Sequence, residues 1–262
     1  MENVREPAVA GLFYPENPTK LQREVDEFLA AAEPGDRIPK ALVAPHAGYI
    51  YSGPIAGTAY AQLAPVAERI RRVLLLGPAH RRAIRGMAFS TADVFRTPLG
   101  EVAVDLEALN AIRDLPRVKE LEVPFEGEHC LEVQLPFLQT VLQDFKIVPV
   151  LVGDAAAKDV ARVLETLWGG EETLIVISSD LSHYLDYFSA RDIDAKTSRA
   201  IEQLRPEDIG PNNQACGRIP LNGLLLEAQR HGLEAVTLDL RNSGDTAGPR
   251  NQVVGYGAYV FS

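Results

Sequence analysis

Apolar residues along the chain form short strand-like runs that alternate with longer stripes of helical spacing. The strand-like segments lie at 41–44, 73–76, 147–152, 174–177 and 253–261. The first, second and fourth are continuous apolar runs, which suit strands buried on both faces, as in a parallel sheet covered by helices. The stretch 81–128 is less regular, and we expect extra strands or a lid there.

Helical spacing recurs between these segments. One apolar stripe runs over 18–31, and another follows Ser52-Gly-Pro54, where the proline is pre-set for a first helical turn. Asp154 and Ser189 are predicted to cap two further helices, and another stripe lies over 221–228. Alternation of strands with helices predicts an α/β fold with a central, mostly parallel sheet flanked by helices.

Length and composition agree with one α/β domain over residues 1–262. Hydrophobic residues make up 46 % of the chain and charged residues 24 %, which is ordinary for a globular protein. The 26 basic and 36 acidic residues give a net charge of −10, and the basic residues are scattered, which argues against nucleic-acid binding. No stretch approaches the roughly 20 apolar residues of a membrane span. Two cysteines form no disulfide framework, so we expect a cytoplasmic protein.

Three of the five histidines come shortly after predicted strands. His46, His80 and His183 each lie in a short turn that contains Gly, Pro or Ser. Ligands of open α/β sheets bind beyond the carboxyl ends of the strands. We therefore expect at least two of these histidines to face a common crevice. His231, late in a helical stripe, is typical of a surface or helix-end residue.

His129 and Cys216 lie in loops just before helical segments and are candidates for the same crevice. Imidazole and thiolate together suit iron, copper and zinc, whereas magnesium and calcium need clustered carboxylates. The sequence has no Cys-x-x-Cys and no His-Glu-x-x-His motif. Any metal site is therefore assembled from distant segments, with few protein ligands and open positions, as expected of a working metal.

Two other activities have weaker support. The segment Ser178–His183 contains the residue types of a Ser-His-Asp triad. It lacks a Gly-x-Ser-x-Gly elbow, and residues so close in sequence rarely form the relay geometry. Gly255-Tyr-Gly257 lacks the third glycine of a dinucleotide fingerprint, and no Walker A pattern occurs. A metal site is the better interpretation.

Several short segments, each weak alone, are highly specific in their order along nearly the whole chain. They are Arg5-Glu-Pro-Ala-Val-Ala-Gly-Leu-Phe-Tyr-Pro15, Pro45-His-Ala-Gly-Tyr49, Gly77-Pro-Ala-His80, Glu128-His129 with Glu132 and Leu135-Pro136, Ser178-Ser-Asp-Leu-Ser-His183, Ala215-Cys-Gly-Arg218 and Asn242-Ser-Gly-Asp245. Together they resemble the MEMO family. That family in turn resembles the class III, non-haem-iron extradiol dioxygenases, which implies one α/β domain with a central sheet and a crevice site.

The resemblance also implies a set of site residues. It assigns His46, His80 and Cys216 as metal ligands and places Asp180, His129 and His183 around the metal as the catalytic candidates. In the ring-opening enzymes a Leu-Ser-His segment supplies a catalytic histidine, and Leu181-Ser182-His183 is similar to it. Those enzymes hold iron with two histidines and one carboxylate, whereas the third ligand here resembles a cysteine, as in the MEMO family generally.

The resemblance implies Fe(II) or copper as cofactor, and zinc is compatible with the same donors. The leading hypothesis is a redox enzyme acting on an unidentified small molecule in the crevice. The alternative is a non-enzymatic module that binds a peptide or holds a metal. Microbial members are often named with the three-part AmmeMemoRadiSam system, which implies a functional link to a radical-SAM protein. Animal members are associated with signalling and phosphotyrosine peptides, but this sequence shows no arginine cluster for phosphotyrosine.

Overall fold

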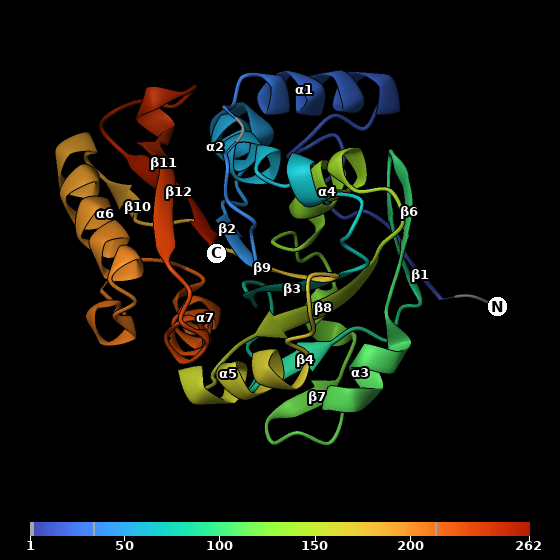
Figure 1. The fold of residues 1–262 in the computed structure, drawn as a ribbon. Helices are drawn as coiled ribbons and strands as arrows, with labels where there is room; N and C mark the ends of the chain where they lie inside the picture. The colour runs from blue at the N-terminus through green and yellow to red at the C-terminus, as the bar shows by residue number, and fades with distance from the viewer. Residues whose placement is uncertain (1–2, 34, 213) are drawn as a thin grey trace.

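The computed structural model describes residues 3–33, 35–212 and 214–262 and shows an α/β fold around a long mixed sheet (Figure 1). From one edge to the other the strands are β10 (His183–Leu185), β12 (Val253–Phe261), β2 (Ala41–Ala44), β9 (Thr173–Ser178), β3 (Arg72–Pro78), β8 (Lys146–Val152), β4 (Met87–Phe89) and β7 (Val118–Glu120). A further strand, β11 (Ala235–Asn242), pairs with β12.

The centre of this sheet is parallel and its flanks are mixed. Strands β2, β9, β3 and β8 run parallel to one another, as the sequence predicts. On one flank β12 joins β2 antiparallel, and on the other β4 joins β8 antiparallel. The expected α/β fold is therefore confirmed, with antiparallel additions at both sides of its parallel centre.

All five predicted strands are present. Strands β2 and β12 have the predicted bounds, and β3, β8 and β9 are one or two residues longer at their ends. The central strands are buried along almost their whole length because helices cover both faces. This double burial explains why they are recognisable as continuous apolar runs.

Helices form a layer on each face of the sheet (Figure 1). One layer contains α1 (Pro18–Ala30), α2 (Tyr49–Ala61) and α4 (Leu135–Val141), which contact one another, and α2 packs on β2. The other layer contains α3 (Leu106–Ile112), α5 (Ala157–Thr166) and α7 (Arg218–His231), with α7 against β3 and β9. Helix α6 (Tyr187–Glu202) packs on β11 and β12.

Helix α2 begins at Tyr49, earlier than the predicted start at Ser52-Gly-Pro54, and keeps Pro54 in its interior. A proline in a helix removes one hydrogen bond to the carbonyl four residues earlier. That carbonyl belongs to Ile50, an exposed residue. The neighbouring Gly53 brings α1 close, because a Cβ there would lie 2.3 Å from the Phe28 ring.

The predicted caps of two other helices were wrong. Helix α5 starts after Ala156, and the backbone of Asp154 instead forms an isolated β-bridge with that of Arg85. Helix α6 is capped by Asp186, whose side chain accepts hydrogen bonds from the backbone N–H groups of Phe188 and Ser189. Ser189 therefore lies in the first turn. In both cases the apolar stripe predicted the helix correctly, whereas local hydrogen bonds determine the residue at which it begins.

The irregular region 81–128 contributes extra strands. Strands β4 and β7 extend the main sheet, while β5 (Val94–Thr97) pairs with β1 (Val4–Arg5) and β6 (Gly100–Ala103) in a small second sheet. Short 3₁₀ turns lie at Ala64–Val66, Val123–Phe125, Glu132–Gln134, Pro206–Asp208 and Ser243–Asp245. Within the described residues, no helix combines the length and apolar character that a membrane crossing requires.

Candidate metal centre

The parallel centre of the sheet brings three predicted site residues to one edge. His46 follows β2, Asp180 follows β9 and His80 follows β3, and these three strands are neighbours with the same direction. Their carboxyl ends therefore open at the same side of the sheet. Cys216 joins them from the loop before α7.

The three candidate ligands have their donor atoms close together. Nε2 of His46 lies 3.3 Å from Sγ of Cys216, and one donor atom from each of His46, His80 and Cys216 falls within 4.8 Å of the others. The ring centroids of His46 and His80 are 5.1 Å apart. His46 is fully buried, whereas the His80 side chain is 29 % exposed, so solvent reaches the group from the His80 side.

Hydrogen bonds fix the tautomer of His46. Its Nδ1 lies 2.9 Å from Oγ of Ser178, and that hydroxyl donates its single hydrogen to the Cys130 carbonyl at 2.6 Å. Ser178 must therefore accept from Nδ1–H, as it also accepts from Nε2 of Gln134 at 2.8 Å. The lone pair of His46 is left on Nε2, the nitrogen that points toward Cys216.

Glu128 does the same for His80. Its carboxylate accepts from Nδ1 of His80 at 3.0 Å and from the His80 backbone N–H at 2.7 Å. The same carboxylate accepts from the backbone N–H groups of His129 and Cys130. The hydrogen bonds from His80 lower the pKa of Glu128 despite its burial. His80 therefore carries its proton on Nδ1 and presents Nε2 as an electron-pair donor.

Cys216 and Asp180 are held together by their backbones. The Asp180 N–H donates to Sγ of Cys216 at 3.3 Å, and the Cys216 N–H donates to the Asp180 carbonyl at 3.2 Å. Burial and the Asp180 carboxylate both raise the pKa of Cys216. Burial also raises the pKa of Asp180, against the effect of the backbone N–H of His46, which donates to Oδ1 at 2.7 Å. A thiolate here needs a nearby cation.

His129 completes a cluster of three imidazoles. Its ring centroid lies 5.6 Å from that of His46 and 5.2 Å from that of His80. Burial, followed by the charge of His46, lowers the pKa of His129 to about 4, so the ring is neutral at pH 7. Its Nδ1 is buried and lies 3.4 Å from Oε1 of Glu128, yet finds no aligned hydrogen-bond partner among the described residues.

His183 lies beside this cluster, on β10. Its Nδ1 donates to the Leu181 carbonyl at 2.8 Å, which makes Nε2 the basic nitrogen. His183 is close enough for its charge to act on the pKa values of both His46 and Asp180. The next residue, Tyr184, is 70 % exposed and has a φ of 60°, a conformation that non-glycine residues adopt at a cost.

The structure adds supporting residues that the sequence analysis did not single out as such. Glu128 orients His80, and the only feature of the sequence that could have indicated this role is its position directly before His129, a candidate site residue. Phe13, in the N-terminal segment shared with the MEMO family, lies 4.7 Å from the His129 ring between centroids, and no spacing rule indicated this contact. Cys130 is fully buried and donates from Sγ to the Pro78 carbonyl.

Ser178, a candidate nucleophile in the hydrolase interpretation, is fully buried and has its hydroxyl committed to His46 and Cys130. A substrate cannot reach it there, and Nδ1 of His183 donates to the Leu181 carbonyl. The geometry therefore argues against a serine hydrolase.

The donor set fits a soft or borderline metal. Two imidazoles, each oriented by a hydrogen bond from its other nitrogen, converge with one thiol, and the Asp180 carboxylate lies 4.0 Å from Nε2 of His46. This combination suits copper, zinc and Fe(II) better than magnesium or calcium. Nδ1 of His129, which has no hydrogen-bond partner among the described residues, is a further nitrogen available for a hydrogen bond beside the same donors.

Comparison with known proteins gives one consistent family. Residues 5–260 match the Memo-like protein family. A MEMO1 family protein of Aquifex aeolicus is 39 % identical, covering 98 % of this chain and 99 % of its own, and one of Archaeoglobus fulgidus is 37 % identical with the same coverage. The crystal structure of an uncharacterized protein from Escherichia coli K12 is similar in fold, with a TM-score of 0.52 and 13 % identity, and covers 86 % of this chain and 100 % of its own.

Proposed function

Because this chain belongs to the Memo-like, or MEMO1, family, we propose that it binds iron or copper through His46, His80 and Cys216 and uses this centre for redox chemistry on a small molecule. The observation that carries the proposal is the convergence of the three donor atoms within 4.8 Å of one another. They come from three separate loops, so their convergence is a property of the fold.

The ligand environment supports a metal with exchangeable positions. Three protein donors leave part of a coordination sphere for substrate, as in catalytic sites, whereas structural zinc sites are closed by four protein ligands. When bound, iron or copper would supply Lewis acidity and one-electron redox chemistry. Ser178 and Glu128 would hold the two imidazoles in the tautomers that donate from Nε2.

Proton transfer would be carried out by residues that surround the three proposed metal ligands. His183, with its proton on Nδ1, would accept a proton at Nε2 from a substrate hydroxyl. His129 is neutral at pH 7 and would act as a hydrogen-bonding group or proton acceptor, not as a cation. Asp180, whose pKa is raised by burial, would exchange a proton with groups beside Cys216.

Aromatic side chains near these groups favour an aromatic substrate. Phe13 packs against His129, and the exposed Tyr184 lies next to His183, with ring centroids 5.8 Å apart. Together they offer flat apolar surfaces beside groups that accept protons. A catechol-like molecule, with two neighbouring hydroxyls on one ring, combines the shape and the acidity that this surrounding would recognise.

Metal retention tests the proposal directly. We expect His46→Ala and His80→Ala to lose iron or copper on gel filtration while remaining folded, measured by elemental analysis and circular dichroism. His183→Gln is the matched control, because its role is proton transfer, and it should keep its metal. Its turnover should fall by roughly 10²–10⁴-fold, the usual contribution of acid–base catalysis. Normal metal content in His46→Ala or His80→Ala would refute the ligand assignment.

A second measurement separates enzyme from binding module. Anaerobically loaded Fe(II) protein is mixed with catechols and oxygen, and ring opening is followed by absorbance. A protein that retains metal but opens no ring would favour the alternative of a peptide-binding or metal-holding module. Loss of metal from His183→Gln would instead make that residue a ligand.

A further inference from the structure

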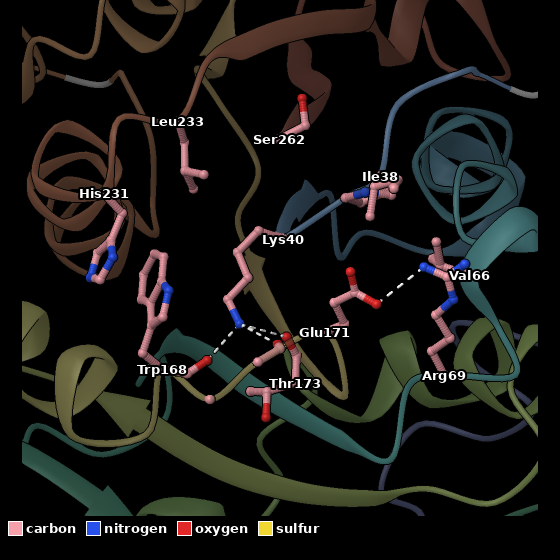
Figure 2. A pocket seen from close by; sticks show the side chains of 13 residues that line it. Ile38, Lys40, Val66, Arg69, Trp168, Glu171, Thr173, His231, Leu233 and Ser262 are labelled. Atoms are coloured by element: carbon pink, nitrogen blue, oxygen red, sulfur yellow. Dashed lines mark hydrogen bonds and ion pairs between the residues drawn. The ribbon is translucent and has the colours of Figure 1, made fainter.

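A second group of metal-binding side chains lies where α5 and α7 pack together. Glu165 is near the end of α5, and Glu227 and His231 are four residues apart on α7, on one face of that helix. His231 also lines a pocket of about 380 Å³ together with Lys40 and Thr173 (Figure 2). Lys40 directly precedes β2, and Thr173 is the first residue of β9. This is the amino edge of the sheet, opposite the edge that carries His46 and its neighbours.

The three side chains point their donor atoms at one another. Nε2 of His231 lies 2.8 Å from Oε2 of Glu165 and 3.5 Å from Oε2 of Glu227. All three donor atoms fall within 4.8 Å of one another. The group therefore offers one imidazole nitrogen and two carboxylate oxygens around a common point.

Glu227 supplies the independent evidence that something belongs there. Its side chain is only 5 % exposed, and its buried Oε2 finds no hydrogen-bond partner within the described part of the chain. A buried carboxylate oxygen without a donor is costly. That oxygen faces His231, so its lone pairs are directed into the group.

The protein's own cations compensate this charge only in part. Arg230 approaches the other oxygens, Oε1 of Glu165 at 3.7 Å and Oε1 of Glu227 at 3.8 Å, and its side chain is 62 % exposed. The Oε2 atoms of both glutamates lie on the side of Nε2 of His231. Burial and the neighbouring Glu165 raise the pKa of Glu227, as expected for two carboxylates that share a small space.

We infer that Glu165, Glu227 and His231 form a second metal site, for a divalent transition-metal ion such as Zn²⁺. One imidazole with two carboxylates is a zinc-type donor set, and the imidazole disfavours magnesium and calcium. The cation would satisfy Oε2 of Glu227 and join the ends of α5 and α7. The inference is independent of the proposed redox centre at the other edge of the sheet.

The chain carries its own reporter for this site. Its single tryptophan, Trp168, stacks on His231 with ring centroids 3.8 Å apart and planes at 8° (Figure 2). A paramagnetic ion bound to His231 would therefore quench the tryptophan emission. We choose Co²⁺ as the probe, because it replaces Zn²⁺ in similar donor sets.

The experiment is a Co²⁺ titration of the full-length protein followed by Trp168 emission, with chelator added at the end. We expect saturable quenching that the chelator reverses and that Zn²⁺ competes away. Glu227→Gln should weaken it by about 10–100-fold or more, since even lost supporting contacts cost that much. Glu165→Gln should weaken Co²⁺ binding as well, and because Glu165 is exposed, this substitution should not disturb folding.

Two controls locate the effect. Glu234→Gln removes an exposed carboxylate three residues beyond His231, and His46→Ala removes a ligand of the other centre; both should quench like the parent protein. The inference is overturned if the parent shows no saturable quenching, or if Glu165→Gln and Glu227→Gln titrate like the parent. Loss of quenching in His46→Ala would also overturn it, because the ion would then sit at the redox centre.

Discussion

At the scale of single residues, the proposed metal centre depends on which nitrogen of each imidazole carries the proton. His46 and His80 each commit Nδ1–H to a buried acceptor, the Ser178 hydroxyl and the Glu128 carboxylate. Each imidazole is therefore oriented before any ion arrives. The burial of His46 lowers its pKa well below the usual value, so protons do not compete with a metal at neutral pH.

Glu128→Gln tests this preorganisation. The amide places an NH₂ group where a carboxylate oxygen accepts hydrogen bonds from backbone N–H groups, and two donors cannot pair, so the His80 loop loses part of its support. We expect Cu(I) affinity to fall by about 10–100-fold, the usual effect of removing a group that orients a ligand. Chelator competition measures this, and Glu126→Gln, an exposed neighbour, is the control. Equal affinities in the two variants would show that Glu128 does not position His80.

At the scale of elements, helix α6 is joined to the site by one buried carboxylate. Asp194 accepts from the backbone N–H and hydroxyl of Ser182, the residue before His183, each at 3.0 Å. It also lies against Gly255 of β12, where a Cβ would come within 2.0 Å of Oδ2. This contact connects α6, β12 and the segment that carries His183. Burial raises the pKa of Asp194 to about 6 despite the hydrogen bonds from Ser182.

The raised pKa predicts how stability changes with pH. Between about pH 4 and 6 the folded protein holds a proton on Asp194 that the unfolded chain has released. The contribution of this group to stability therefore falls as pH rises through that window. Asp194→Asn does not titrate, so it should gain about 3 kcal/mol relative to the parent between pH 4 and 7. Denaturant unfolding at several pH values measures the difference.

Asp192→Asn, an exposed position on the same helix, is the control for the Asp194 experiment. Its stability difference from the parent should be flat across the same pH range. If the Asp194→Asn difference were also flat, then Asp194 would be ionised in the folded protein at acid pH and the helix contact would not carry this pH dependence.

At the scale of the whole molecule, the proposed metal centre connects parts of the chain that are distant in sequence. His46 and Cys216 are 170 positions apart, and β2, β3 and the loop before α7 meet only after the sheet has formed. An ion that binds these donors binds the folded state alone. Metal binding should therefore stabilise the entire fold by mass action.

Anaerobic Cu(I) should raise the melting temperature of the protein. At a free concentration about 100 times the Kd, binding adds about 2.7 kcal/mol, or roughly 5–10 °C for a domain of this size. His231→Gln should show the same rise, because carboxylates and a single imidazole are poor Cu(I) donors. His46→Ala should show none. A similar rise in His46→Ala would mean that Cu(I) stabilises the protein through other residues, and calorimetry with and without chelator distinguishes these outcomes.

The sequence by itself determined the α/β fold and its central strands. Doubly buried strands need continuous apolar runs, and β2 and β12 begin and end where those runs do. It also nominated His46, His80 and Cys216, because their turns follow strands or precede a helix and because the order of short motifs matched a known family. Helix ends were less predictable. The N-cap residues of α5 and α6 are Ala156 and Asp186, and local hydrogen bonds, which the apolar stripe does not encode, determine these positions.

Tertiary structure alone decided which partners each side chain meets. Ser178 belongs to the same short segment as His183, yet its hydroxyl meets His46, because β2 and β9 are parallel neighbours. His231 had the pattern of an ordinary helix end, and only the packing of α5 on α7 places it between two carboxylates. Spacing along the chain encodes which face of an element is buried, whereas contacts between elements depend on how the whole sheet orders its strands.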